Sequence, residues 1–267
     1  MILLPKFFNE KVANNRKTLR LKLQESCDKC GHQGYVETGD NMFVDCECVK
    51  TFYKLRDYID CGLNENDIYN DSNLKSFPEV ITEKINRMIA KIQSYYGHNF
   101  FFYLINKLSY GTDIISKYIL EKFADNGFTC YTITMKQLIE IFFDFENEKY
   151  NGCIDFLKSV QVLLITGMGM EYNSKMKTDD TFVVSSLSGF LSERKNKTTM
   201  LSSTFTKEVL HSTYSKELVS LITKEFLGFG VESMERQETE YDIIRKKKLD
   251  IGFDDLDIIK PVRKKIR

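Results

Sequence analysis

The residues best placed by type and spacing to do chemistry are four cysteines near the N-terminus. Cys27 and Cys30 form a Cys-x-x-Cys-Gly turn, and after fifteen intervening residues Cys46 and Cys48 form a second pair. Two close thiolate pairs on two turns supply the tetrahedral sulfur ligands that Zn²⁺ prefers, and Gly31 gives the first turn backbone freedom. Because four protein ligands leave no open position for a substrate, we expect a structural zinc site.

Two features bear on this zinc prediction. The second pair has one intervening residue rather than two, so His32 is an alternative ligand, although its simpler role is that of a turn residue. The chain has seven cysteines, and the odd number with four clustered is typical of a metal site in a reducing compartment rather than of a disulfide framework. The other three are expected to be core thiols: Cys61, Cys130 and Cys153.

The second candidate for chemistry is the loop that follows an apolar, strand-like run at 100–105. A nucleotide-binding phosphate loop joins a strand to a helix with the pattern Gly-x-x-x-x-Gly-Lys-Ser/Thr. Registered on Gly111, this chain has Asn106 for the first glycine, Thr112 for the lysine and Asp113 for the Mg²⁺-binding hydroxyl. Thr112 cannot neutralise phosphate. The Asp113 carboxylate lies where phosphate would bind, while it favours the helix N-terminus itself.

The strand predicted at 161–166 also lacks an acid that P-loop ATPases need. In those enzymes the strand that holds Mg²⁺ ends in Asp followed by Asp or Glu, whereas here Thr166 and Gly167 occupy the end. We therefore expect no catalytic residues, no hydrolysis and no tight binding of ATP. An alternative is a true ATPase that binds nucleotide in an unusual way, for which Lys107 is the nearest cation.

Hydrophobic periodicity predicts the elements that carry these residues. The chain has 267 residues, of which 42% are hydrophobic, enough to bury a sizeable core. Short apolar strands alternating with helices predict an α/β fold, with a parallel sheet covered by helices on both faces. Helices are expected at 1–26, 49–60, 77–96, 113–125, 135–145, 151–158, 180–194, 206–212 and 214–227, and strands at 100–105, 129–134, 161–166 and 199–203. We expect three regions: 1–76, 77–230 and a charged segment at 231–267.

Charge and hydropathy limit the partners. Lys plus Arg and Asp plus Glu both number 38, so any basic surface must be local. Residues 1–26 carry a local charge of +4, and 260–267 carry five cations and no acid. Either stretch is a contact surface for nucleic acid or a partner, or simply a solvated face. The candidate contact residues are Arg16, Arg20 and Lys22, with Thr18 between them, and Arg263, Lys264, Lys265 and Arg267.

Two further expectations concern aromatic residues and the membrane. Aromatic side chains near the basic stretches are expected mainly to pack in the core, with base stacking as the alternative: Phe7, Phe8, Tyr35, Phe43 and Phe52. No apolar run reaches the roughly 18 residues that a membrane-spanning helix needs, and the apolar N-terminus is too short for a signal peptide. We expect a soluble cytoplasmic protein with no membrane partner.

The cysteine motif and the residues after it resemble a known family. The order Cys27-Asp-Lys-Cys30-Gly-His-Gln-Gly34-Tyr35, Cys46-Glu-Cys48-Val-Lys and Gly62-Leu-Asn…Ile68-Tyr69…Leu74-Lys-Ser-Phe77 is similar to that of zinc-containing phage and Gram-positive helicase loaders of the DnaC/DnaI type. These loaders and the related IstB-type transposition helpers belong to the AAA+ superfamily. Downstream, 199–204 resembles the family's sensor strand and 214–221 its arginine-finger helix. Thr204 replaces the sensor asparagine, and Ser220 replaces the arginine.

The resemblance implies an AAA+ P-loop-type fold with a small N-terminal zinc-binding domain. Because four diagnostic positions differ, it implies a pseudo-ATPase: a non-hydrolysing adaptor that binds a replicative helicase and assists its loading on single-stranded DNA. Such a chain can also assemble with an active AAA+ partner or with itself. Two other functions stay open, an inhibitor or decoy of a host helicase made by a phage or mobile element, and a helper protein for transposition or recombination.

Overall fold

The computed structural model describes residues 4–39, 42–64, 66–68, 74–75, 77–105, 111–144, 146–169 and 180–231. They lie within one compact unit, Met1–Met234. Apart from Val231, the predicted charged segment at 231–267 falls outside the described residues, and so do its four candidate contact residues. Among the helices described, none is both long enough and apolar enough to cross a membrane.

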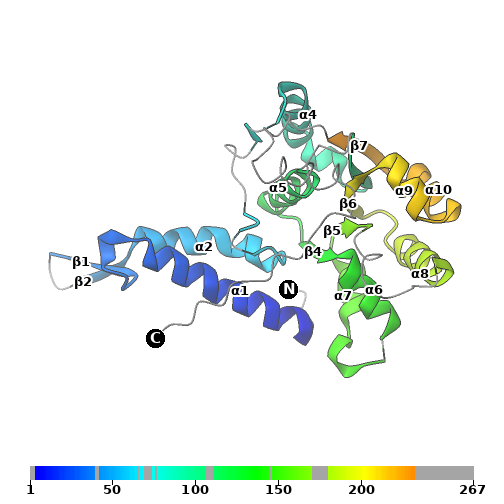
Figure 1. Ribbon diagram of the computed structural model, residues 1–267. Coiled ribbons are helices and arrows are strands. Elements are labelled where there is room, and N and C mark those ends of the chain that lie inside the picture. Colours follow the sequence, from blue (N-terminus) through cyan, green and yellow to red (C-terminus); the bar gives the residue numbers. More distant parts are fainter. Residues whose placement is uncertain are drawn as a thin grey trace, which may run out of the picture. The chain divides into compact units, whose positions relative to one another are not determined.

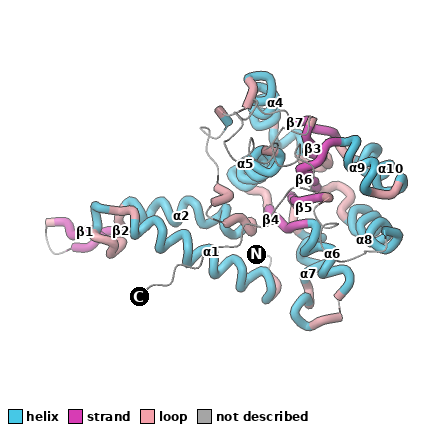
Figure 2. Tube along the Cα trace, viewed as in Figure 1, coloured by secondary structure: helices cyan, strands magenta, loops and turns pink. Residues whose placement is uncertain are grey.

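The centre of the unit is a five-stranded sheet in which every pair of neighbouring strands is parallel. The strand order is β4-β5-β6-β3-β7. Helices cover both faces of this sheet (Figures 1 and 2). The strands are β3 (Phe100–Leu104), β4 (Cys130–Thr134), β5 (Val162–Met168), β6 (Thr198–Thr206) and β7 (Leu227–Val231). The helices that follow or flank them are α4 (Glu79–Ala90), α5 (Thr112–Asp125), α6 (Met135–Phe143), α7 (Cys153–Ser159), α8 (Asp180–Glu193), α9 (Lys207–Thr213) and α10 (Lys216–Glu225), with short 3-10 turns at Ile92–Tyr95 and Glu148–Tyr150.

Side chains of the central strands divide between two apolar cores because successive residues of a strand point to opposite faces. On β3, Phe100 and Phe102 join the core that contains α4 and α5. Phe101, between them, joins the core formed with α6, α7, α9 and α10. A strand buried on both faces is a continuous apolar run rather than an alternating one, as the sequence at 100–105 shows.

The N-terminal region consists of two helices that pack against each other, α1 (Lys6–Glu25) and α2 (Glu47–Asp60). A 3-10 turn at Asp28–Cys30 and an antiparallel hairpin of β1 (Tyr35–Thr38) and β2 (Met42–Asp45) lie between them in the chain (Figure 1).

The beginning of α1 and the end of α2 contact the sheet domain. The Phe8 ring lies 4.8 Å from that of Tyr131 on β4, centroid to centroid. After α2, the Cys61 carbonyl accepts a hydrogen bond of 2.8 Å from the Thr132 amide on the same strand. The two helices are therefore fixed to the sheet at β4, its edge opposite β7.

A buried arginine, Arg194, lies at the end of the sheet where the strands begin. Arg194 is 2% exposed, and its guanidinium donates to the carbonyls of Leu157 and Val160 at the end of α7 and to Thr198 at the start of β6. It also donates to the Thr199 hydroxyl at 3.0 Å. Burial lowers the pKa of Arg194 to about 10, so the side chain is charged at neutral pH.

The structure confirms the predicted α/β fold class and places helices and strands close to the predicted ranges. Three differences stand out. The helix predicted at 77–96 ends at Ala90 and continues as a 3-10 turn. The segment at 27–48, for which no helix or strand was expected, contains the β1–β2 hairpin. The strand β7 had no counterpart in the prediction.

Candidate metal centre and degenerate nucleotide site

The four predicted ligands of zinc come together where the chain passes from α1 to α2. Cys27 follows the end of α1, Cys30 lies in the 3-10 turn, Cys46 caps the N-terminus of α2 and Cys48 lies in its first turn. Gly31 has a positive φ of 53°, which lets the first pair turn back on itself. The amide of Cys46 donates to the Gly34 carbonyl at 2.9 Å, which holds the two turns together.

The sulfur positions fit a tetrahedral zinc ion. All four Sγ atoms lie within 4.8 Å of one another. The Cys27–Cys46 and Cys30–Cys48 sulfur distances are 3.6 Å and 3.7 Å. Tetrahedral geometry with Zn–S bonds of ~2.3 Å places sulfurs about 3.8 Å apart. The four cysteines therefore have both the donor chemistry and the spacing that a structural zinc site requires.

The surroundings of the cluster shift the pKa values of two of its thiols in opposite directions. The Gly34 amide donates to the Cys30 sulfur at 3.3 Å, and this bond lowers the pKa of Cys30 to about 7. Burial raises the pKa of Cys48 to about 12. His32 does not belong to the cluster, because its Nδ1 lies 2.8 Å from the Gln24 carbonyl and its φ is 69°. It is a turn residue, the simpler of its two predicted roles.

The hairpin beside the cluster exposes large apolar side chains. Met42 is 61% exposed and Phe43 is 63% exposed, with Val44 and Tyr35 also exposed. The rings of Tyr35 and Phe43 pack edge to face at a centroid distance of 5.1 Å. The charged residues at this end are mixed and mostly acidic: Asp28, Glu37, Asp45 and Glu47 against Lys29 and Lys50, of which Lys50 pairs with Glu47 at 2.8 Å. We call Tyr35, Met42, Phe43 and Val44 the hairpin patch.

The other aromatic residues considered for base stacking have core roles. Phe8 is buried, and Phe7 and Phe52 pack against the same core. Phe7 contacts the ring of Tyr150 at 5.2 Å. Of the five, only Tyr35 and Phe43 leave large exposed surfaces, so the expectation of core packing holds for three of them.

The candidate contact residues of α1 have different environments. Arg16 forms a two-pronged ion pair with Asp60 of α2, with distances of 2.6 Å and 2.5 Å. Lys22 donates to Asn66 at 3.0 Å. Arg20 is exposed. Thr18 carries no charge, and its hydroxyl donates to the Asn14 carbonyl at 3.0 Å. The ion pair with Asp60 makes Arg16 a residue that joins α1 to α2.

The loop compared above with a phosphate loop leads into α5, and of its predicted positions Asn106 lies outside the described residues. Gly111 precedes the helix with a φ of 97°, and a methyl group at this position would overlap the ring of Phe77. Thr112 is fully buried, and its hydroxyl has no hydrogen-bond partner among the described residues. Phe77 therefore covers the backbone at the point where a phosphate loop opens toward its ligand.

Asp113 is held by the neighbouring strand. The Ser202 hydroxyl of β6 donates a hydrogen bond to the Asp113 carboxylate in the first turn of α5. The amides of a helix N-terminus attract negative charge, and here the first turn of the helix carries the protein's own carboxylate. The sequence did not connect Ser202 or Phe77 with this loop because neither lies near it in the chain.

The end of β5 completes this edge of the sheet. Thr166 is buried, and Gly167 has a φ of 72°. The Ser203 hydroxyl of β6 donates to the Met168 carbonyl at 2.8 Å, which ties the two strand ends together. Thr204 and Ser220, at the positions resembling the sensor and the finger, are both exposed. The structure thus brings Gly111, Asp113 and Ser202 together, and β5 ends in Thr166, Gly167 and Met168, none of which carries a charge.

No protein-family model matches the sequence, and no curated protein matches it. Among solved structures, the DnaC helicase loader is similar with a TM-score of 0.46 and 14% identity, over 58% of this chain and 93% of that one. DnaI is similar with a TM-score of 0.44 and 15% identity, over 63% and 90%. The replication initiator DnaA bound to AMPPCP and single-stranded DNA gives 0.46 and 14%, over 70% and 54%. TM-scores and sequence identities this low do not show the family of the chain, so its similarity to these proteins stays a resemblance.

Proposed function

We propose that this chain is a nucleotide-independent adaptor in DNA replication, which binds a replicative helicase and assists its loading on single-stranded DNA. The observation that carries the proposal is the Asp113 carboxylate at the N-terminus of α5, held by Ser202. The helicase as partner is taken from the resemblance to DnaC/DnaI-type loaders.

The geometry around Asp113 opposes nucleotide binding. A phosphate at the start of α5 would meet a carboxylate where a phosphate loop offers amides and a lysine. Two like charges about 4 Å apart repel by roughly 1 kcal/mol in water and by several times that near a protein surface. The Thr166 and Gly167 end of β5 supplies no carboxylate for Mg²⁺. We propose that the fold serves as a scaffold for binding partners and that ATP has no part in it.

We call α1, the cysteine cluster, the β1–β2 hairpin and α2 the zinc module, and we assign this part to contact with the protein partner. The hairpin patch is apolar and exposed, which marks protein contact surfaces more often than nucleic-acid ones. Its acidic neighbours repel a phosphate backbone. A structural zinc ion would fix the hairpin between α1 and α2 and so present the patch in one conformation.

The test is complex formation between the purified zinc-loaded chain and the replicative helicase of its own host, measured by size exclusion with and without ATP. We expect the same complex in both conditions. The variant Phe43→Ser should weaken it, whereas Val80→Ser should not. Val80 is a matched control because it is also 63% exposed but lies on α4.

The possible results separate the proposals. A complex that requires ATP would contradict the nucleotide-independent function. If a complex forms, a loading assay on single-stranded DNA distinguishes a loader, which increases helicase loading, from a decoy, which lowers it. No complex in either condition would overturn the helicase as partner and favour a transposase or an active AAA+ protein.

A further inference from the structure

The strand β7 is an unprotected edge of the sheet. It pairs with β3 on one side and is last in the strand order of the described residues. Edge strands expose unpaired amides and carbonyls, and proteins usually protect them with charged residues or proline. The sequence Leu-Gly-Phe-Gly-Val of β7 contains neither. Among the residues that the structure describes, no strand pairs with its outer side.

The two glycines of β7 present their backbone groups outward. The Leu227 amide donates to Asn99 at 2.8 Å, and the Val231 carbonyl accepts from Ile105 at 3.0 Å, so these residues face β3. In a parallel ladder alternate residues bond to opposite neighbours. The amide and carbonyl groups of Gly228 and Gly230 consequently point away from β3. Gly228 is exposed and Gly230 is half-buried.

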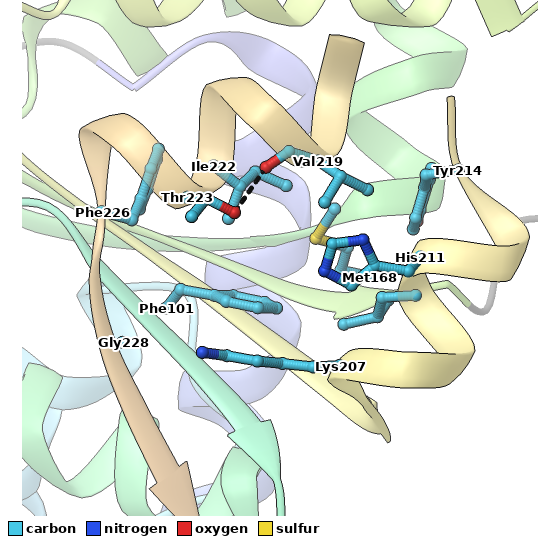
Figure 3. Close-up of a pocket in the computed structure, with 11 residues that line it drawn as sticks. Phe101, Met168, Lys207, His211, Tyr214, Val219, Ile222, Thr223, Phe226 and Gly228 are labelled. Carbon is cyan, nitrogen blue, oxygen red and sulfur yellow. Dashed lines mark hydrogen bonds between the residues drawn. The ribbon is translucent and has the colours of Figure 1, made fainter. Parts of the chain in front are cut away.

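A hollow lies on each face of the sheet beside this edge, and Gly228 lines both. The first, of about 130 Å³, is closed by Phe101 of β3 and by α9 and α10 (Figure 3). The second, of about 270 Å³, lies against α4 and includes Phe100 and Leu227, which is 51% exposed. Successive side chains of an added strand would point alternately into the two hollows.

The charge around both hollows is positive. Lys207 lines the first, with its amine 4.5 Å from the centroid of the Tyr103 ring, and Figure 3 shows this amine end directed toward Gly228. Lys84 and Arg87 line the second, where Arg87 also pairs with Glu83 at 2.8 Å. Among the described residues, no acid lines either hollow.

We propose that β7 is a docking edge for an extended peptide segment of a partner protein, which adds to the sheet as a sixth strand. The segment carries an aromatic side chain for the larger hollow between two branched aliphatic ones on the side of the smaller hollow, and acidic residues flank these three. Backbone hydrogen bonds to Gly228 and Gly230 hold it, and the two hollows select its side chains. This site is separate from the zinc module and goes beyond the proposed function.

The test uses the full chain and the synthetic peptide acetyl-Glu-Asp-Val-Phe-Val-Asp-Glu-amide, with binding followed by NMR. We expect hydrogen exchange of the Gly228 and Gly230 amides to slow at least about tenfold at saturation, since both become hydrogen-bonded. Two further peptides are N-methylated, one on the valines and one on the phenylalanine and aspartates. Because alternate amides of an added strand face β7, one methylated peptide should lose binding and the other should keep it.

Two protein variants give independent readings. Gly228→Pro removes an outward amide and should weaken binding about tenfold, the effect of losing about 1.4 kcal/mol. Gly228→Ala is the control, because its Cβ would lie 3.4 Å from Tyr103, an ordinary contact. The double variant Lys84→Glu with Lys207→Glu should weaken the acidic peptide and remove the salt dependence of its binding. Unchanged exchange of both glycine amides at millimolar peptide, or equal binding of the two methylated peptides, overturns the proposal.

Discussion

Replacing Asp113 by alanine should destabilise the folded chain. The carboxylate accepts a hydrogen bond from Ser202 and lies in the first turn of α5. A hydrogen bond to a charged group contributes ~1.5–3 kcal/mol, and an acid at a helix N-terminus adds about 0.3–1 kcal/mol. The expected loss is therefore about 2–4 kcal/mol. At roughly 2–4 °C per kcal/mol for a chain of this size, Tm should fall by about 4–16 °C.

The assay is urea and thermal unfolding of Asp113→Ala, Ser202→Ala and the double variant, all zinc-loaded. If the two side chains act as a pair, their coupling energy should be about 1–3 kcal/mol. Asp155→Ala is the matched control, since Asp155 is an exposed acid in the first turn of α7 and should lose only the helix-terminus contribution. An Asp113→Ala variant as stable as wild type, or a coupling near zero, would refute the reasoning. In a P-loop ATPase this position serves Mg²⁺, so such a result would reopen nucleotide binding.

Three further predictions concern the zinc cluster, the buried arginine and the glycine before α5. Metal analysis of protein purified without chelator should give one zinc per chain, and Cys48→Ser should reduce this value; well under one zinc in the wild type would remove the site. Arg194→Leu should lower stability by about 3–5 kcal/mol in urea unfolding, because it leaves several buried carbonyls unpaired; a loss below 1 kcal/mol would contradict this role. Gly111→Ala should cost about 2–4 kcal/mol because its φ is 97° and its methyl group would overlap Phe77; the added variant Phe77→Leu should restore part of this, and no restoration would argue against that contact.

Most of the sheet domain was predictable because each of its helices and strands has one clear hydrophobic pattern in its sequence. The apolar run at 100–105 and the helical spacing at 113–125 predicted β3 and α5 almost to the residue. Thr134 also begins α6 where predicted, with a capping box in which its side chain bonds to Gln137. Signals of this kind depend only on residues that are close in the chain, so a single sequence is enough to find them.

The strands that were missed lack such a pattern. β7 contains two glycines in five residues, and glycine weakens the strand signal. It is a strand because β3 lies beside it and accepts its backbone hydrogen bonds. β1 and β2 expose nearly every side chain, so no buried face imposes an alternation on their sequence.

The candidate sites also divide into local motifs, which the sequence predicts, and contacts between distant residues, which it does not. The cysteine cluster was predictable because two short motifs contain all four ligands, and the structure brings their sulfurs together. The comparison of 106–113 with a phosphate loop came from its spacing, and the degenerate nucleotide site stays a prediction. The contact of Asp113 with Ser202 was not, because 89 residues separate the two in sequence. The ring of Phe77 over Gly111 is equally non-local, and the sequence placed Phe77 only at the start of a predicted helix.

The environments of the cations in α1 bear on which partner the N-terminal region contacts in the proposed function, a protein or single-stranded DNA. Arg16 is paired with Asp60, and Lys22 is bonded to Asn66. Burial lowers the pKa of Lys11, which lies near Asp67 and Lys117. The local charge of +4 therefore overstates what α1 offers to phosphates, since each phosphate contact needs an accessible cation. The hairpin end of the same module has an apolar patch and acidic neighbours. We therefore propose a protein partner for the N-terminal region and a secondary role for any contact with single-stranded DNA.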